Sequence, residues 1–317
     1  MKISSVCVIG GTGLIGRHVV QRLVAREVFV RVPTRRRERV KEELILLPTV
    51  DVINADVHDP RVLSRLIAPA DAVINLVGVL HQAGRETFER NHVELPRKIV
   101  AACREHGVKR LLHVSALKAS LDAPSAYLRS KAEGESQIRS AQATGLQTTV
   151  FRPSVVYGRG DHFLNLFAKL SRLLPVVPLA CADARFQPIF VEDVAHAITR
   201  SLGDPYTFGQ TLNLCGPRVY SLRELVAYVC STLGLHRKII GLPESLGMLQ
   251  AWALEHLPGK LMTRDNLYSM RLDNTCDAGF PEAFGFAPTP LEAVVPTYLA
   301  GVTPRRRYYW FRFRARR

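Results

Sequence analysis

The stretch Val6–Val20, VCVIGGTGLIGRHVV, decides the fold that this sequence predicts. It opens with four apolar residues, which are typical of a buried parallel strand, and continues through a glycine-rich turn. After the turn, apolar residues recur at the spacing of an amphipathic helix. A strand, a glycine turn and a helix in this order are the setting in which such a motif binds the pyrophosphate of a dinucleotide.

Three glycines at intervals of three residues have separate roles in that turn. Gly10 lets the chain leave the strand, Gly13 removes a Cβ that would hold the backbone away from a pyrophosphate, and Gly16 allows close helix–strand packing. The first N–H groups of the helix have no partner within it, so they face the bound anion. We therefore predict a dinucleotide site with contacts from Gly10, Thr12, Gly13, Leu14, Ile15 and Gly16.

A run of arginines follows the second predicted strand. Sites selective for NAD usually place an Asp or Glu about 20 residues after the first glycine, where it binds the ribose 2′-OH. Residues 30–37 contain no acid and four arginines, Arg31, Arg35, Arg36 and Arg37. Because guanidinium groups match a 2′-phosphate, we predict NADP(H) rather than NAD(H), with Arg35 and Arg36 as its contacts. A solvated basic loop is the alternative.

Predicted strands alternate with helical patterns through the first half of the chain. The strands lie near residues 50–55, 71–77 and 111–114, and their alternation with helices implies a doubly wound parallel sheet, an α/β fold. Ligands on such sheets bind outside the carboxyl ends of the strands. At that edge we expect Asp56, Val57, Val77, Gly78 and Ser115.

The helix that follows Ser115 carries Tyr127 and Lys131 at positions i and i+4, on one helical face. A phenol is a poor acid or base at neutral pH, and a nearby ammonium would lower its pKa toward the working range. Ser115 would hydrogen-bond a substrate oxygen beside that phenol. A solvent-facing pair without catalytic function is the alternative. The dinucleotide setting favours an active site that consists of Ser115, Tyr127 and Lys131.

Together these motifs resemble those of extended or atypical short-chain dehydrogenases/reductases, over nearly the whole chain. The resemblance implies a Rossmann fold with a smaller C-terminal substrate lobe. It also implies Tyr127 as general acid/base, Lys131 on the nicotinamide ribose and Ser115 on the substrate. Residues 151–158 resemble the segment that closes over the nicotinamide, which adds Pro153 and Val155 to the cofactor contacts.

Four stretches resemble, more narrowly, the nucleotide-binding accessory subunits of respiratory complex I and their bacterial relatives. These are residues 32–37, 75–78, 127–131 and 183–188. That family typically holds NADPH, often without demonstrated turnover, and is linked to quinone metabolism or to a membrane-bound respiratory complex. One departure is local, since Glu27 and Val28 replace the family's Gly-His after the first helix.

Three functions follow as hypotheses from this resemblance. The first is an NADP(H)-dependent oxidoreductase that acts on an apolar carbonyl or alcohol, such as a quinone precursor or a lipid. The second is a non-catalytic accessory or assembly factor that holds NADPH. The third is a nucleotide-sugar epimerase or dehydratase, which the shared fold permits.

The predicted domains are a cofactor domain over residues 1–155, completed by parts of 186–216, and an interleaved substrate lobe over 156–304. Within that lobe, Leu246, Leu249, Trp252 and Leu257 suggest one more helix.

The tail, residues 305–317, holds seven arginines, five aromatic residues and no acid. This composition suits an anionic membrane surface or a membrane complex. RNA or a solubilising role are alternatives, and nucleic acid is the least favoured.

The composition is that of a globular protein, with 47% hydrophobic and 22% charged residues. Six cysteines show neither a C-x-x-C pair nor zinc-ligand spacing, so we predict no metal site and buried free thiols at Cys7, Cys103 and Cys230. The first strand leaves no room for a signal peptide, and no apolar run of about 18 residues is present. We therefore expect a cytoplasmic protein, peripheral at most on the inner face of the membrane.

Overall fold

The computed structural model describes residues 3–38, 44, 46–257, 260–300, 312 and 315. The chain divides into two compact units. The first consists of residues 1–153, 191–214 and 281–285, and the second of 154–190, 215–280 and 286–317. The assignment of one region to the cofactor and the other to the substrate stays a prediction.

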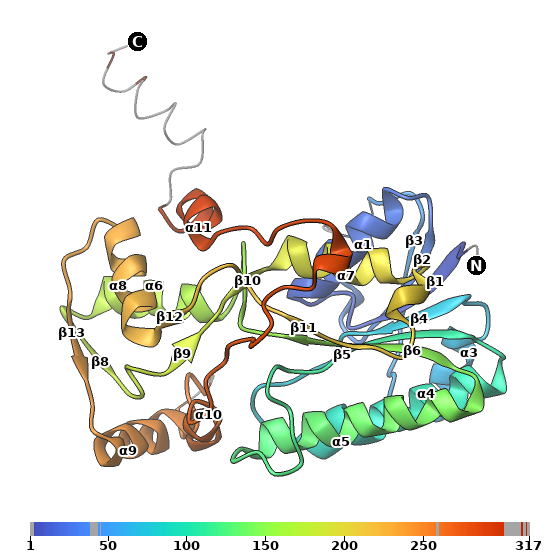
Figure 1. The fold of residues 1–317 in the computed structure, drawn as a ribbon, viewed down its shortest axis with the longest axis horizontal. Helices are drawn as coiled ribbons and strands as arrows, with labels where there is room; N and C mark the ends of the chain where they lie inside the picture. The colour runs from blue at the N-terminus through green and yellow to red at the C-terminus, as the bar shows by residue number, and fades with distance from the viewer. Residues whose placement is uncertain are drawn as a thin grey trace. The chain divides into compact units, whose positions relative to one another are not determined.

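A parallel sheet of seven strands forms the centre of the first unit (Figure 1), which confirms the predicted doubly wound fold. Its order is β11-β6-β5-β4-β1-β2-β3, so the order reverses between β1 and β4, where such sheets bind ligands. The strands are β1 (Ser5–Ile9), β2 (Phe29–Thr34), β3 (Val50–Asn54), β4 (Ala72–Asn75), β5 (Arg110–Val114), β6 (Gln147–Pro153) and β11 (Thr211–Leu214).

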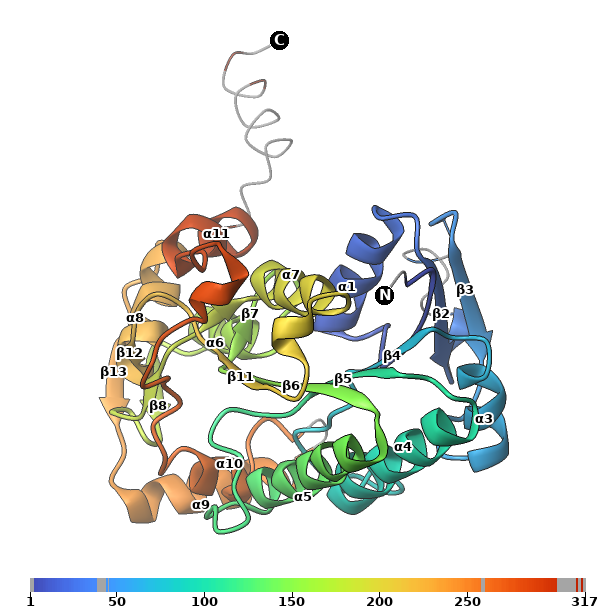
Figure 2. The same cartoon turned by 45° about the vertical axis from the view of Figure 1, so that its right-hand side comes forward.

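Helices cover both faces of this sheet, as Figure 2 shows. One face carries α1 (Leu14–Val24) and α7 (Val191–Ser201), which pack against each other. The other carries α3 (Pro60–Ile67), α4 (Leu95–Glu105) and α5 (Ala126–Ser140). The β-branched and leucine side chains of the strands are almost wholly buried between these layers, as the apolar runs of the sequence predict.

The turn after α1 has a left-handed backbone at a residue other than glycine. Glu27 has a φ of 59°, in the left-handed region that favours glycine. Such a position costs a residue with a Cβ about 1–2 kcal/mol. Glu27 therefore strains the turn, and β2 pairs with β1 from Phe29 onward.

The second unit has a separate core and three small two-stranded sheets. Buried side chains from α6 (Phe163–Leu173), α8 (Leu222–Thr232) and α11 (Leu291–Leu299) form that core. Two further helices are α9 (Glu244–Glu255) and α10 (Arg264–Ser269). The sheets pair β7 (Val156–Tyr157) with β10 (Ile189–Phe190), β8 (Val176–Leu179) with β13 (Lys238–Gly241), and β9 (Arg185–Phe186) with β12 (Tyr220–Ser221).

The cysteines differ in part from expectation. Cys7, Cys103 and Cys230 are buried free thiols, as predicted. Cys215 and Cys276, however, form a disulfide with a Cα–Cα distance of 6.1 Å. They are 61 residues apart in the sequence, so no local spacing marks them as a pair. Both lie in the second unit, where the bond joins the segment after β11 to the segment after α10.

Among the described residues, no helix combines the length and the apolar character that crossing a bilayer requires.

Candidate functional site

The glycine turn between β1 and α1 has the geometry that a pyrophosphate site needs. Gly10 has a φ of 84°, and a Cβ on Gly16 would lie only 2.3 Å from the Gly10 carbonyl oxygen. Helix α1 begins after Gly13 without a side-chain cap. The first-turn N–H groups, those of Leu14 and Ile15 included, are therefore left to bind an anion. Thr12 is half-buried within the turn, and its contact with a pyrophosphate stays a prediction.

The loop after β4 lies directly against this turn. A Cβ on Gly10 would be 3.1 Å from the backbone nitrogen of Val77. The side-chain oxygen of Asn75 accepts a hydrogen bond from the Val77 N–H at 3.2 Å, which fixes the loop. A Cβ on Gly78 would be 3.5 Å from the Nζ atom of Lys131. The structure thus brings the glycine turn, Val77, Gly78 and Lys131 to one edge of the sheet.

Lys131 and Ser115 meet at the carboxyl end of β5. Lys131 is buried, and its Nζ atom donates a hydrogen bond to the Val114 carbonyl oxygen at 2.9 Å. Ser115 follows immediately and is 4% exposed. Within the described part of the chain, its hydroxyl is buried without a hydrogen-bond partner. A buried hydroxyl of this kind has unused capacity to bind a polar atom of a ligand.

Tyr127 lies in the first turn of α5, which Ser125 caps by accepting a hydrogen bond from the Leu128 N–H. Its ring is half-buried and packs edge-on against Phe88 and His92, with centroid distances of 5.9 Å and 5.6 Å. The helix start therefore fixes the backbone of Tyr127, and the two neighbouring rings fix its side chain.

The electrostatics of this pair differ from the sequence expectation. Burial raises the pKa of Tyr127 to about 12, where we predicted that Lys131 would lower it. Burial also lowers the pKa of Lys131 to about 8, although Glu135 opposes that change. The spacing of a tyrosine and a lysine does not report burial, and burial is the larger effect for both groups. At neutral pH Tyr127 therefore keeps its phenol proton.

His92 and Ser130 are two residues that sequence reasoning missed. His92 belongs to a π-helical turn, Glu89–Glu94, and its Nε2 atom accepts a hydrogen bond from the Val79 N–H at 3.0 Å. Its Nδ1 atom must then carry the proton, which it donates to the Ser130 hydroxyl at 2.9 Å. That hydroxyl donates to the Tyr127 carbonyl oxygen at 2.8 Å.

This hydrogen-bonded chain depends on a neutral histidine. Burial, followed by the nearby Lys131 charge, lowers the pKa of His92 to about 2, so the ring stays neutral. Gly134 permits the close packing, since a Cβ there would lie 1.8 Å from the His92 carbonyl oxygen. A glycine inside a predicted helix was the one signal in the sequence that pointed to such an approach.

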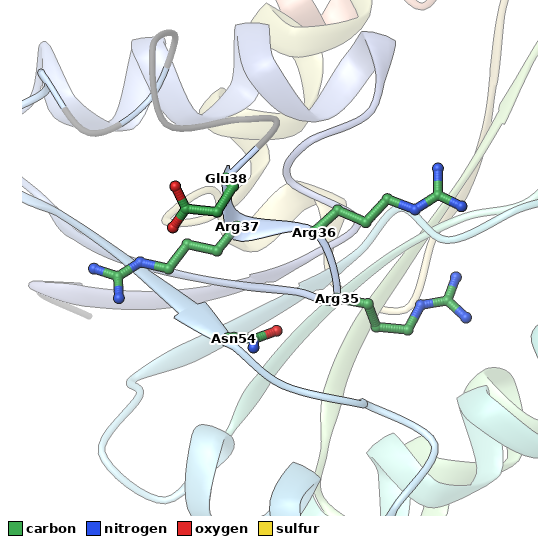
Figure 3. A pocket seen from close by; sticks show the side chains of 5 residues that line it. All are labelled: Arg35, Arg36, Arg37, Glu38 and Asn54. Atoms are coloured by element: carbon green, nitrogen blue, oxygen red, sulfur yellow. The ribbon is translucent and has the colours of Figure 1, made fainter.

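The arginine-rich segment after β2 lines an exposed pocket of about 590 Å³, with Arg35, Arg36, Arg37, Glu38 and Asn54. Figure 3 shows the guanidinium groups of Arg35 and Arg36 on one side, and that of Arg37 with the Glu38 carboxyl on the other. Arg31 instead lies on β2, 3.9 Å from the Asp51 carboxylate. Which of these arginines contacts a cofactor stays a prediction.

Arg35 has an acidic partner that the sequence window did not reveal. Glu86, from the segment after β4, forms an ion pair with it. Burial raises the pKa of Glu86, but hydrogen bonds from Arg35 and Asn91 outweigh it and lower that pKa. A second pair joins Arg90 to Asp56, at 3.5 Å. The guanidinium of Arg35 therefore already donates a hydrogen bond to an acid 51 residues away in the sequence.

The remaining predicted contacts lie in several places. Asp56 and Val57 follow β3, where we expected the adenosine end of the cofactor. Pro153 ends β6, and its carbonyl oxygen accepts a hydrogen bond from the Leu117 N–H. Val155 belongs to the second unit and donates its N–H to the Asn274 side chain at 3.1 Å. The roles of these residues toward a cofactor stay predictions.

A family model and several known proteins are similar to this chain. The model of the NAD dependent epimerase/dehydratase family matches residues 6–215. The mitochondrial NADH dehydrogenase (ubiquinone) 1 alpha subcomplex subunit 9 of Mus musculus is 33% identical, over 90% of this chain and 77% of that protein. A ceramide reductase of Caulobacter vibrioides is 32% identical, over 78% and 76% respectively.

Solved structures show the same fold. The UDP-glucose 4-epimerase of Thermus thermophilus, in complex with NAD, superposes with a TM-score of 0.62 at 20% identity, over 84% of this chain and 99% of that one. MoeE5, in complex with UDP-glucose and NAD, superposes with a TM-score of 0.69 at 18% identity. The superposition covers 93% of this chain and 97% of that one. The family model covers the glycine turn, the sheet and the Tyr127 helix. This chain therefore belongs to the NAD dependent epimerase/dehydratase family.

Proposed function

We propose that this protein is an NADP(H)-dependent reductase of an apolar carbonyl compound, with Tyr127 as the proton donor. One observation carries the proposal. The buried ammonium of Lys131 is held on the Val114 carbonyl oxygen, next to the unused hydroxyl of Ser115 and one helical turn from Tyr127. A phenol whose pKa lies near 12 enters the reaction as an acid, and carbonyl reduction consumes a proton.

The chain's own residues then have distinct tasks. A bound nicotinamide would supply the hydride that reaches the carbonyl carbon. Ser115 donates a hydrogen bond to the carbonyl oxygen and orients it. Tyr127 transfers its phenol proton to that oxygen, which completes the alcohol, and the ammonium of Lys131 stabilises the phenolate that remains.

The substrate class that we propose is a long-chain lipid or quinone precursor with a carbonyl group. The relative named as a ceramide reductase supports a lipid. The test is to incubate the purified protein with NADPH and a long-chain keto-lipid, and to follow the loss of reduced nicotinamide and the alcohol product by mass spectrometry. Cofactor that stays reduced with every keto-lipid and quinone precursor tried would contradict the proposal.

A non-catalytic role is the second candidate, in which the protein holds NADPH within a membrane respiratory complex. Identity of 33% with a mouse NADH dehydrogenase subunit over 90% of the chain favours it. Native mass spectrometry of the purified protein separates the two, because an accessory subunit would retain NADPH that does not exchange. The nucleotide-sugar alternative is supported only by a likeness of fold below 25% identity and by the breadth of the family. No residue of the site favours it.

The arginine pocket predicts the cofactor preference. Because Glu86 already engages Arg35, we expect Arg36 to be the main contact of the 2′-phosphate. Arg36→Ala should weaken NADPH binding by about tenfold or more, the usual effect of losing a charge-assisted hydrogen bond, and leave NADH binding unchanged. Calorimetric titration with both cofactors measures the difference.

Arg37→Ala is the matched control, because its guanidinium lies on the other side of the pocket in Figure 3. It should change the affinity for NADPH little. Equal losses of NADPH and NADH affinity in the Arg36 variant, or a larger loss in the Arg37 variant, would show that Arg36 does not read the 2′-phosphate.

A further inference from the structure

Five large apolar side chains around helix α9 face solvent. They are between 42% and 59% exposed, and we call them the α9 stripe: Leu246, Leu249, Trp252, Leu257 and Leu261. The first three recur every third residue along the helix, so they lie along one side of it. Scattered exposed leucines are ordinary, whereas a contiguous run of this kind marks an interaction surface.

The opposite face of α9 is buried through small residues. Ala251 is fully buried and packs with Ala180 and Leu267. A Cβ on Gly247 would lie 3.1 Å from the Ala180 Cβ, so the helix lies close against its support. A surface helix normally buries its large apolar residues and exposes polar ones. Helix α9 instead buries Gly247 and Ala251, and it leaves the large apolar side chains of the stripe available to a partner.

The charges around the stripe favour an anionic partner. The two acids of α9, Glu244 and Glu255, form ion pairs with Arg271 and Arg264, each at 2.6 Å. Their negative charge is therefore neutralised, while Lys238, in the strand before the helix, is exposed. The chain as a whole carries a net charge of +15. A second copy of the chain would bring the same net charge and repel it, whereas an anionic surface attracts it.

We propose that the α9 stripe docks on the surface of an anionic lipid bilayer. Leucines would enter the boundary of the acyl chains, and the Trp252 ring, which packs against His256 at 5.1 Å, would lie at the level of the headgroups. The exposed ammonium of Lys238 would meet lipid phosphates. This docking is independent of turnover, so it holds for a reductase and for an accessory subunit alike.

The tryptophan content of the chain allows a direct test. The sequence has only two tryptophans, Trp252 and Trp310. In the full-length Trp310→Phe variant, the tryptophan fluorescence therefore comes from helix α9 alone. We expect this protein to sediment with phosphatidylglycerol/phosphatidylcholine vesicles. Its emission should shift to the blue and be quenched by brominated acyl chains, with less binding to phosphatidylcholine alone and less at high salt.

Substitutions in the stripe then locate the contact. Leu246→Ser with Leu249→Ser, in the Trp310→Phe background, should lower the vesicle partition coefficient by about tenfold or more. Tyr206→Ser is the matched control, because Tyr206 is 88% exposed and lies in the first unit, and it should leave binding unchanged. The side chains of Leu246, Leu249 and Tyr206 are each about half or more exposed. Their replacement should therefore leave the thermal unfolding, followed by circular dichroism, unaltered.

Three outcomes would overturn the proposal. Sedimentation without a shift in Trp252 emission would assign the contact to the basic tail. A blue shift that grows with protein concentration in the absence of lipid would assign the stripe to self-association. A protein that does not sediment with the anionic vesicles even at low salt does not dock on them.

Discussion

Replacing Tyr127 with phenylalanine should lower the rate of carbonyl reduction by about a hundredfold to ten-thousandfold, the usual contribution of a positioned general acid. The change removes the phenol oxygen and keeps the ring that packs against Phe88 and His92. The hydrogen bond from Ser130 reaches the backbone of residue 127, so it survives the substitution. Affinity for NADPH should therefore be unchanged while turnover falls.

The measurement is steady-state reduction of the keto-lipid, together with a calorimetric titration of NADPH. Tyr206→Phe is a suitable control, since that phenol is solvent-exposed, and it should leave both quantities unchanged. If the Tyr127 variant reduces substrate as fast as the unaltered protein, Tyr127 is not the acid. If it restores respiration in cells that lack the protein, the accessory role is favoured over catalysis.

The second large effect concerns stability and depends on Arg110, whose side chain is fully buried. Its guanidinium donates to the carbonyl oxygens of Ser201 and Leu202, at 2.6 Å and 3.3 Å, and of Gln147 at 3.1 Å. Ser201 is the last residue of α7, so the negative end of a helix dipole faces the cation. Backbone groups therefore stabilise this charge inside the protein.

Further contacts complete this site and explain the direction of its pKa. The guanidinium donates to the Thr149 and Thr207 hydroxyls at 2.7 Å and 3.1 Å, and it lies over the Phe208 ring at 4.4 Å. Burial lowers the pKa of Arg110 to about 9, with Asp204 opposing the change. A single buried side chain thus joins β5 to β6 and to the end of α7 through hydrogen bonds to their carbonyl oxygens.

Arg110→Met should destabilise the protein by about 3 kcal/mol or more, because it removes a buried guanidinium together with its hydrogen bonds to the carbonyl oxygens of Ser201, Leu202 and Gln147. Urea unfolding followed by circular dichroism measures the loss. Lys109→Met removes a cation from the neighbouring exposed position, and it should change stability by no more than about 0.5 kcal/mol. An equal loss of unfolding free energy in the two variants would show that the buried hydrogen bonds of Arg110 do not stabilise the protein.

The features predictable from the sequence were those that depend on neighbouring residues. The glycine turn at Gly10 and the alternation of strands and helices follow from local backbone chemistry. They were sufficient to predict the sheet and the edge at which Gly78 lies close to Lys131. The pairing of Arg35 with Glu86 joins residues 51 apart, and that of Cys215 with Cys276 residues 61 apart. Neither has a local signal, because only the packed fold brings the partners together.

The pKa of Tyr127 was mispredicted for a related reason. Helical spacing correctly put Lys131 one turn away, but spacing says nothing about how much water either group loses on folding. Likewise, the apolar periodicity from Leu246 to Trp252 correctly predicted a helix, while the side of that helix that is buried depends on the small residues Gly247 and Ala251. The period of the apolar residues shows that a helix has an apolar face, whereas the packing of the fold determines whether that face is buried.

The chain of hydrogen bonds from Val79 through His92 and Ser130 to Tyr127 also has a thermodynamic consequence. Its members are neutral groups, so acidification within the physiological range does not release it. The segment after β4 and the first turn of α5 are consequently restrained together before any ligand arrives. The backbone of Tyr127, which we propose as the proton donor, is therefore ordered when the chain folds. Its entropy is not lost again each time a substrate binds.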